Sequence, residues 1–267
     1  TDPLDIVEKY SADALRFSLM MQTATGQDVY VSDEKFKTGR NFGTKIWNVA
    51  RFMNLHSKDV PEAVHAPRFE GDLLSPDDQH ILIKLHRAAA ECEEHLEKFR
   101  LNDAAKALYE FIWHQYCDWY VEYSKEMLNG DDERRKASTL LVLHHVFSSA
   151  LRLLHPFMPF LTEELWRAMG YNNARESIMN APFPVPMDPG ELKKDGILPE
   201  AEGYVDAKHD LIRVALVLRG DYNLTQSQKA NYIVKPASTE LARRLTADRS
   251  SVAILLRAET ITNAGSY

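Results

Sequence analysis

The sequence predicts a mainly α-helical protein: an antiparallel helical bundle followed by a small, incomplete α/β unit. Apolar residues recur at helical spacing along most of the chain up to about residue 170, and capping residues and prolines mark the helix ends. From residue 181 the chain turns rich in Pro, Gly and charged residues, and a mixed pattern of helices and strands follows. Long amphipathic helices joined by short loops bury their apolar faces most simply as an antiparallel bundle.

Length and composition allow one or two domains. The 267 residues are 45% apolar and 27% charged, which is enough for a substantial core. We expect a connector over residues 1–32, the bundle domain over 33–180, a linker over 181–203 and the α/β unit over 204–267. The last residues contain no convincing structural stop, so we expect this unit to be truncated. No run is apolar and long enough to predict a membrane span, and a formal charge of -7 argues against unselective coating of nucleic acid.

The first 56 residues predict two helices. Asp2 and Pro3 are typical of a helix start, and apolar positions continue that helix to Met21. Ser32 is a predicted N-cap, because acidic residues follow it in the first turn. The second helix therefore extends over residues 33 to 56.

Three longer helices and a short one complete the predicted bundle. Ser75 and Pro76 begin a helix whose buried stripe ends at Phe99. Asn102 is the predicted cap of the next helix, which Gly130 closes. Acidic residues at 131 and 132 open a further helix that Pro156 stops, and the last bundle helix covers roughly 159 to 169.

The C-terminal unit shows shorter elements. A helix is predicted over about 203 to 219, a strand over 230 to 234 and a helix beginning at Ser238. The apolar run 251 to 256 is a second strand candidate. These alternating elements predict a small α/β fold.

Motifs for catalysis or for a metal centre are lacking. The chain has no glycine-rich phosphate loop, CxxC, HExxH or GxSxG motif, and its one Glu-x-x-His match, at Glu62, lies in a proline-bounded loop. The histidines at 144, 145 and 155 follow an apolar helix and its end, so we interpret them as structural. Cys92 and Cys117 sit in apolar patterns, as expected for core thiols in a reducing compartment. We therefore expect no catalytic residue, metal site or cofactor, and a module that binds something.

The helix over 33 to 56 carries two different faces. Ile46, Ala50 and Met53 form an apolar stripe, whereas another side presents amide, cation, amide and aromatic groups in turn. The second set comprises Asn41, Lys45, Asn48 and Phe52. Cations meet phosphates, amides read base edges and a ring stacks on an unpaired base, so this face fits single-stranded RNA. The alternative is that Phe52 belongs to the core and the polar residues form a solvated face.

Several segments resemble a known family, the valyl-tRNA synthetases. The resemblance extends from the first residue to about Pro184, and its segments keep the family's order: Asp2 to Asp5, Tyr10 to Phe17, Arg40 to Phe52, Cys117 to Glu122 and Leu154 to Trp166. Isoleucyl and leucyl enzymes share the second and last segments in general form. The segments at Arg40 and Cys117 point to the valine enzyme.

The resemblance implies a tRNA-binding fragment rather than a complete enzyme. In this family the ATP-clamping loop lies just upstream of the segment matching Asp2 to Asp5, so the catalytic and editing domains are expected to be missing here. The parent would be a valine–tRNA ligase that uses ATP and Mg²⁺. Expected partners are the anticodon end of valine tRNA and the catalytic domain of the same parent chain. We expect a cytoplasmic monomer without membrane contacts.

The resemblance also implies site residues on two helices. In the family, anticodon bases lie between the helix matching 33 to 56 and the helix matching 103 to 128. Phe52 would stack on a base, Glu122 would accept a hydrogen bond from an exocyclic amine and Val121 would pack beside a ring. The remaining contacts, to phosphates or base edges, would come from Lys45, Asn48, Arg51 and Lys125. Trp119, Tyr116 and Trp166 are predicted core residues.

A second hypothesis belongs to a different class. An aromatic-rich helical bundle without catalytic motifs is also typical of a scaffold that binds protein partners. Affinity for valine tRNA compared with the same tRNA carrying a changed anticodon separates the two, because only the RNA-binding module should discriminate.

Overall fold

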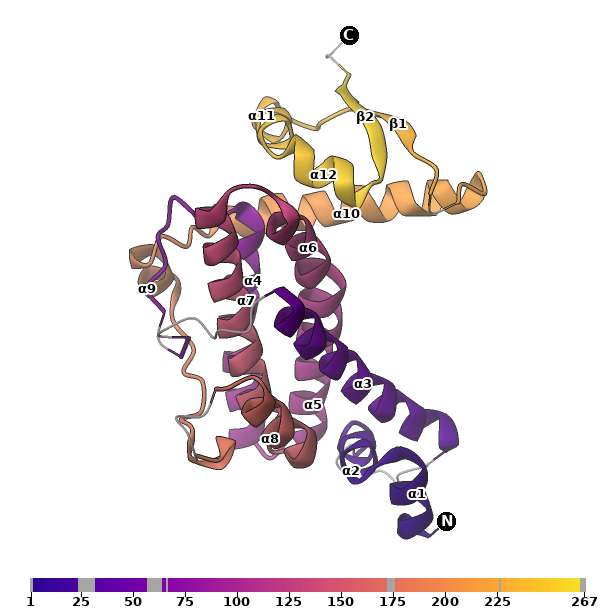
Figure 1. Ribbon diagram of the computed structural model, residues 1–267, viewed down its shortest axis with the longest axis vertical. Coiled ribbons are helices and arrows are strands. Elements are labelled where there is room, and N and C mark those ends of the chain that lie inside the picture. Colours follow the sequence, from indigo (N-terminus) through magenta and orange to yellow (C-terminus); the bar gives the residue numbers. More distant parts are fainter. Residues whose placement is uncertain are drawn as a thin grey trace.

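The computed structural model describes residues 2–23, 32–56, 64–65, 67–171, 176–225 and 227–264. Its helices form a bundle, and the C-terminal residues form a smaller unit at one end of it (Figure 1). The bundle contains α3 (Asp33–His56), α4 (Pro76–Glu97), α7 (Glu133–Leu154), α8 (Pro159–Ala168) and a rod made of α5 (Leu101–Tyr109), η1 (Glu110–Tyr120) and α6 (Val121–Asn129). These elements share one large hydrophobic core. The predicted mainly helical bundle is confirmed.

The predicted first helix is two helices. α1 (Pro3–Tyr10) ends at Ser11, whose φ of 103° breaks the helical path, and α2 (Ala12–Met20) begins directly after it. The Ser11 hydroxyl accepts a hydrogen bond from the Ala14 backbone amide and caps α2. α2 then crosses α3 closely at Gly39, where an added Cβ would lie 2.5 Å from the Ser18 Oγ. Continuous apolar spacing concealed the break.

The predicted start of α4 is confirmed, and its end differs. Ser75 and Asp78 form a reciprocal capping box, with Pro76 in the first turn. Phe99 is wrong as a core residue: α4 ends two residues earlier, at Glu97, and Phe99 is 88% exposed with φ of 55°. Asn102 is wrong as a cap, because α5 begins at Leu101 and Arg100 occupies the cap position.

The rod contains a stretch that sequence spacing did not predict. η1 is π-helical over Glu110–Tyr120, between the regular helices α5 and α6. A π-helix bonds residue i to i+5, so each residue turns less about the axis than in an α-helix. Counting at α-helical spacing therefore misassigns faces. Tyr116 and Trp166 are buried as predicted, whereas Trp119 is half-buried and packs against the C-terminal unit.

The two last bundle helices begin and end near their predicted positions. The Asp132 side chain caps α7, which ends at Leu154, and Gly170 follows α8 with φ of 72°. Among the described helices α7 is long and apolar enough to cross a membrane by length and composition, which the sequence analysis did not predict. However, 78% of its most apolar window is buried, as expected for the central helix of a bundle.

The segment predicted as an extended linker packs onto the bundle. It contains the short helix α9 (Pro189–Lys194), begun by a capping box between Asp188 and Glu191. Leu192 and Ile197 are buried and belong to the bundle's core. Because these two apolar anchors lie among many polar residues, composition alone indicated an extended linker.

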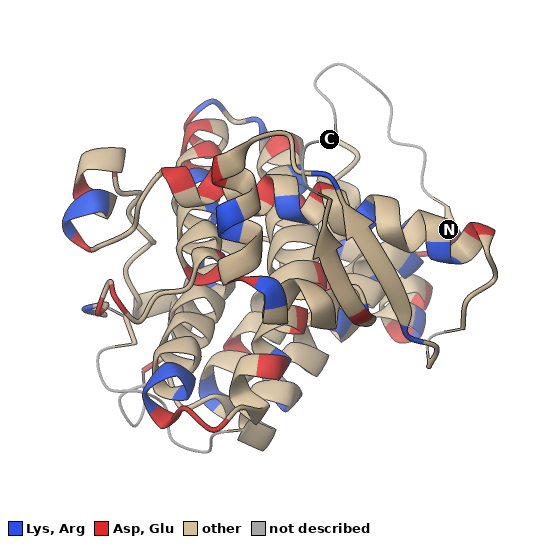
Figure 2. Ribbon diagram, turned by 90° about the horizontal axis from the view of Figure 1, so that it is seen from above, with Lys and Arg blue, Asp and Glu red and all other residues tan. Residues whose placement is uncertain are grey.

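The C-terminal unit has a small core of its own. It consists of α10 (Glu200–Asp221), β1 (Ala230–Val234), α11 (Thr239–Ala247), α12 (Arg249–Leu255) and β2 (Ala258–Asn263). The strands pair in parallel, with Tyr232 opposite Ile261, and Figure 2 looks onto them. The strand predicted over 251 to 256 is wrong: this run is helical, and Val252 and Leu256 lie buried one turn apart. A short apolar run fits either period, and packing decides.

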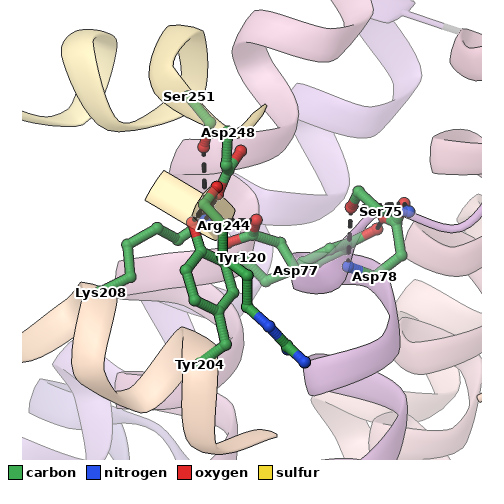
Figure 3. A network of polar contacts seen from close by, with 9 residues as sticks. All are labelled: Ser75, Asp77, Asp78, Tyr120, Tyr204, Lys208, Arg244, Asp248 and Ser251. Atoms are coloured by element: carbon green, nitrogen blue, oxygen red, sulfur yellow. Dashed lines mark hydrogen bonds and ion pairs between the residues drawn. The ribbon is translucent and has the colours of Figure 1, made fainter. Parts of the chain in front are cut away.

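A buried polar network joins the unit to the bundle (Figure 3). Lys208 of α10 is fully buried and donates to the carboxylates of Asp77, at 2.5 Å, and Asp248, at 2.8 Å. Tyr204 donates to the same Asp248 carboxylate at 2.9 Å. The network therefore connects the start of α4 with α10 and with the α11–α12 junction.

Candidate nucleic-acid interface

Helix α3 has the two faces that the sequence predicts. Ile46, Ala50 and Met53 are at most 4% exposed and face the bundle. On the other side Asn48 and Arg51 are exposed, and Lys45 and Phe52 are half-buried. The Phe52 ring packs against the edge of the core and lies 4.7 Å from the His56 ring. Phe52 is thus neither a core residue nor a fully exposed one.

Three predicted residues meet across α3 and α6. The Lys125 Nζ lies 5.9 Å from the centre of the Phe52 ring and 2.5 Å from the Glu122 carboxylate. Glu122 and Lys125 are both exposed. We call this group the Phe52–Glu122–Lys125 cluster. It places a ring, an acceptor and a cation beside one another at the surface.

Lys45 is more engaged than the sequence indicated. Its ammonium forms an ion pair with Asp118 of η1 and lies 4.1 Å from the centre of the Trp113 ring. Asp118 also contacts the His114 Nδ1 at 3.1 Å. By contrast, Arg51 has no ion-pair partner among the described residues, so its guanidinium is the more available cation on this face.

Val121 does not lie where its predicted role requires. Its side chain is 4% exposed and belongs to the bundle core, one position before the exposed Glu122. A valine so deeply buried presents no surface to a base. We therefore correct the prediction: the side chain of Val121 packs the helix and does not contact a base in this conformation.

A large cleft continues from the cluster towards the C-terminal unit. It has a volume of about 990 Å³ between the rod on one side and α10 and α12 on the other, and Glu122 and Lys125 line it. Trp119 forms part of its wall, stacked on the His209 ring at 3.9 Å with the Arg213 guanidinium 5.6 Å from its centre. The sequence analysis missed this wall, because the π-helical turn sets the face of Trp119 and residues at least about 90 positions away supply the other side.

The electrostatics of the face are balanced rather than basic. Lys45 and Lys125 are each paired with a carboxylate, and Glu110 and Glu126 also line the cleft. Figure 2 shows acidic and basic residues interspersed along the helices. Attraction of phosphates alone is therefore a weak basis for binding here, and stacking and base-edge contacts carry more weight.

The remaining sequence candidates are structural. His144 and His145 each place Nδ1 2.9 Å from a protein oxygen, and burial lowers the pKa of both to about 4. His155 contacts the Thr162 hydroxyl at 2.7 Å. Cys92 and Cys117 are free and buried, and burial raises the pKa of both thiols to about 12. Glu62 lies outside the described residues.

Much of the helical region matches a known protein family. Residues 78–234 match the family described as the anticodon-binding domain of tRNA ligase. The chain belongs to this family. The match covers the rod, α7, α8, α10 and most of α4, so one side of the predicted interface and the rod and α10 walls of the cleft lie within it, whereas α12 lies outside it.

Curated relatives confirm the resemblance to the valine enzymes. The chain is 38% identical to the valine–tRNA ligase of Aquifex aeolicus, covering 91% of this chain and 21% of that protein. It is 43% identical to the enzyme of Fusobacterium nucleatum, covering 70% and 21% of the two chains. It is 35% identical to that of Syntrophotalea carbinolica, covering 97% and 28%. The chain thus spans between about a fifth and just over a quarter of these relatives' lengths.

A solved structure shares the fold. The Agrobacterium radiobacter K84 agnB2 LeuRS, in a ternary complex with tRNA and LeuAMS, matches with a TM-score of 0.54 and 20% identity. The match covers 73% of this chain and 21% of that chain. At this identity the likeness shows a common fold alone.

Proposed function

We propose that this chain is the part of a valine–tRNA ligase that holds the anticodon end of valine tRNA, while other domains of the parent polypeptide carry out ATP-dependent aminoacylation. The family match and the valine–tRNA ligase relatives support the proposal. The share of those relatives that the chain spans fits one part of a larger enzyme.

The Phe52–Glu122–Lys125 cluster is the observation that carries this function. The partly exposed ring offers a stacking surface, and the Glu122 carboxylate beside it accepts a hydrogen bond from an exocyclic amine of adenine or cytosine. Lys125 would exchange its pairing with Glu122 for a phosphate when RNA binds, which frees the carboxylate for the base. Arg51, exposed one position before Phe52, supplies a further phosphate contact.

The protein-binding scaffold remains a second candidate, favoured by one feature. α10 exposes a row of apolar side chains at Val214, Val217 and Leu218, with exposed fractions of 60%, 64% and 48%. Exposed apolar patches mark contact surfaces. This surface belongs to α10 and does not involve the cluster.

The test measures binding of the chain to valine tRNA and to the same tRNA with a changed anticodon. Phe52→Ala should weaken binding to valine tRNA by about 5- to 150-fold, which is the stacking contribution of roughly 1 to 3 kcal/mol. Phe99→Ala is the matched control, because it removes an 88% exposed ring outside the interface and should leave binding unchanged. If the phosphate contacts come from Lys45, Arg51 and Lys125, the slope of log K against log salt should be about -2.

The outcomes separate the two candidates. Equal affinity for both tRNAs would favour the scaffold or nonspecific adhesion. Phe52→Ala protein that keeps its helical circular dichroism and its full tRNA affinity would refute the site assignment.

A further inference from the structure

Two buried histidines and a carboxylate converge where α4 meets α10. His80 comes from α4, and Asp206 and His209 come from α10, three residues apart and so on one side of that helix. Each residue offers one donor atom, and the three donor atoms all lie within 4.8 Å of one another. The sequence analysis predicted no such site, because His80 is more than 120 positions away from Asp206 and His209 and the three residues form no motif.

The His209 imidazole is buried without a hydrogen bond. Its side chain is 5% exposed, and its ring contacts are a flat stack on Trp119 at 3.9 Å and an edge contact with His80 at 5.2 Å. Within the described ranges no protein group forms a hydrogen bond with its ring nitrogens, so they are available to a ligand. His80 is 3% exposed, and its Nε2 contacts the Asp206 carboxylate at 2.9 Å. One ligating nitrogen is thus unused, and a second faces the carboxylate.

The residue types suit a cation. Neutral imidazole is the commonest metal ligand in proteins, and the site supplies two imidazoles. Asp206 adds a carboxylate, which lies 3.3 Å from the Lys84 ammonium.

We propose that His80, Asp206 and His209 bind a divalent transition-metal ion of the zinc type, joining the bundle to the C-terminal unit. Two imidazoles and one carboxylate favour zinc, copper, nickel or cobalt over magnesium or calcium, which prefer oxygen ligands. Donor atoms in a tetrahedral zinc site lie about 3.3 Å apart, so the three atoms need to approach one another by no more than about 1.5 Å. A water molecule would occupy the fourth position.

Lys84 opposes the ion and sets its affinity. The Lys84 Nζ lies 3.3 Å from the Asp206 carboxylate, and it also lies 2.9 Å from Glu202. A bound cation would repel the Lys84 ammonium from Asp206, and the ammonium would then remain paired with Glu202. Lys208, two residues from Asp206, is already held by Asp77 and Asp248. Removing the charge of Lys84 should therefore tighten metal binding.

A bound ion would also act on the cleft. His209 stacks on Trp119, a wall residue of the cleft, and α10 forms the opposite wall. Ligation would clip α10 to α4 and hold the two walls at a constant separation. The ion is thus a positioning element for the cleft.

The experiment titrates zinc chloride into tag-free, chelator-treated full chain by isothermal titration calorimetry. One ion per chain is expected, together with a rise in the midpoint of thermal unfolding as zinc is added. His209→Gln and His80→Gln should each weaken binding by at least about tenfold. Lys84→Met should tighten it. His114→Gln is the matched control, because His114 is a half-buried histidine beside Glu110 and Asp118, away from the proposed ligands, and should be dispensable.

Circular dichroism of each variant without metal establishes that it is folded, and Lys84→Met tests the site without removing a ligand. Zinc binding that survives in folded His209→Gln protein, or that is lost in His114→Gln, would overturn the assignment. The assignment would also be overturned if neither the unsubstituted chain nor the Lys84→Met variant bound zinc stoichiometrically.

Discussion

Replacing Lys208 with Met should destabilise the protein more than any other single change in the buried network. Lys208 is 0% exposed, and the two carboxylates it serves, Asp77 and Asp248, have side chains 4% and 15% exposed. Removing the ammonium leaves two nearby carboxylates, largely buried, without their shared cation. Losing one partner of a buried ion pair costs about 3 to 5 kcal/mol, and we expect a loss of this size in the free energy of unfolding at pH 8.

The network is asymmetric, and this sharpens the prediction. It holds two carboxylates for one ammonium, and burial, with Asp248 adding to it, raises the pKa of Asp77 to about 6 although Lys208 opposes this. Asp77→Asn should therefore cost less than about 2 kcal/mol, because it relieves this excess negative charge. Lys229→Met, an exposed lysine of the same unit, is the control and should have an effect within about 0.5 kcal/mol.

The assay is urea unfolding followed by circular dichroism between pH 5.5 and 8. The folded-state pKa of Asp77 lies above the unfolded value, so this group contributes its full stability below the unfolded pKa and loses it as pH rises through about 6. Without Lys208 the pKa rises further, so the deficit of Lys208→Met should shrink as pH falls. A deficit below about 1 kcal/mol, or one that does not change with pH, would refute the reasoning.

Two more predictions concern packing and acid stability. Gly39→Ala should lower the free energy of unfolding, measured in urea, by about 1 to 3 kcal/mol, because the new Cβ would lie 2.7 Å from the Ala14 carbonyl oxygen. Gly203 is a helical glycine with open space around it, so Gly203→Ala should instead stabilise the protein by up to about 1 kcal/mol. A loss for both variants would show that helix geometry, not contact, is responsible. Burial lowers the pKa of His144 and His145 to about 4, so on acidification these histidines take up protons in the unfolded chain before they do so in the folded protein. The stability that is present above pH 6.5 is therefore lost as the pH falls towards 4. Each of the two histidines should lower the free energy of unfolding by about 2 kcal/mol at pH 5, and His144→Asn should reduce the number of protons taken up on unfolding by close to one. An unchanged slope of stability against pH in this variant would contradict the prediction.

Much of the bundle could be predicted from the sequence, because its signals are local. The capping box at Ser75, the cap at Asp132 and the helix end at Gly130 depend on neighbours within a few residues. The bounds of α3 and its two faces follow from helical spacing in the same way. The resemblance to valyl-tRNA synthetases also depends on short ordered segments, which the comparisons confirm.

The tertiary structure decided the features that depend on distant residues. The π-helical turn moves Trp119 from the predicted core to the cleft, and packing makes a helix of the run predicted as a second strand. The cleft, the Lys208 network and the convergence of His80 with His209 each join segments far apart in the chain. Helical spacing and capping residues depend only on residues close together along the chain. Which helix then lies opposite is decided by the burial of whole faces, which the pattern along one helix does not encode.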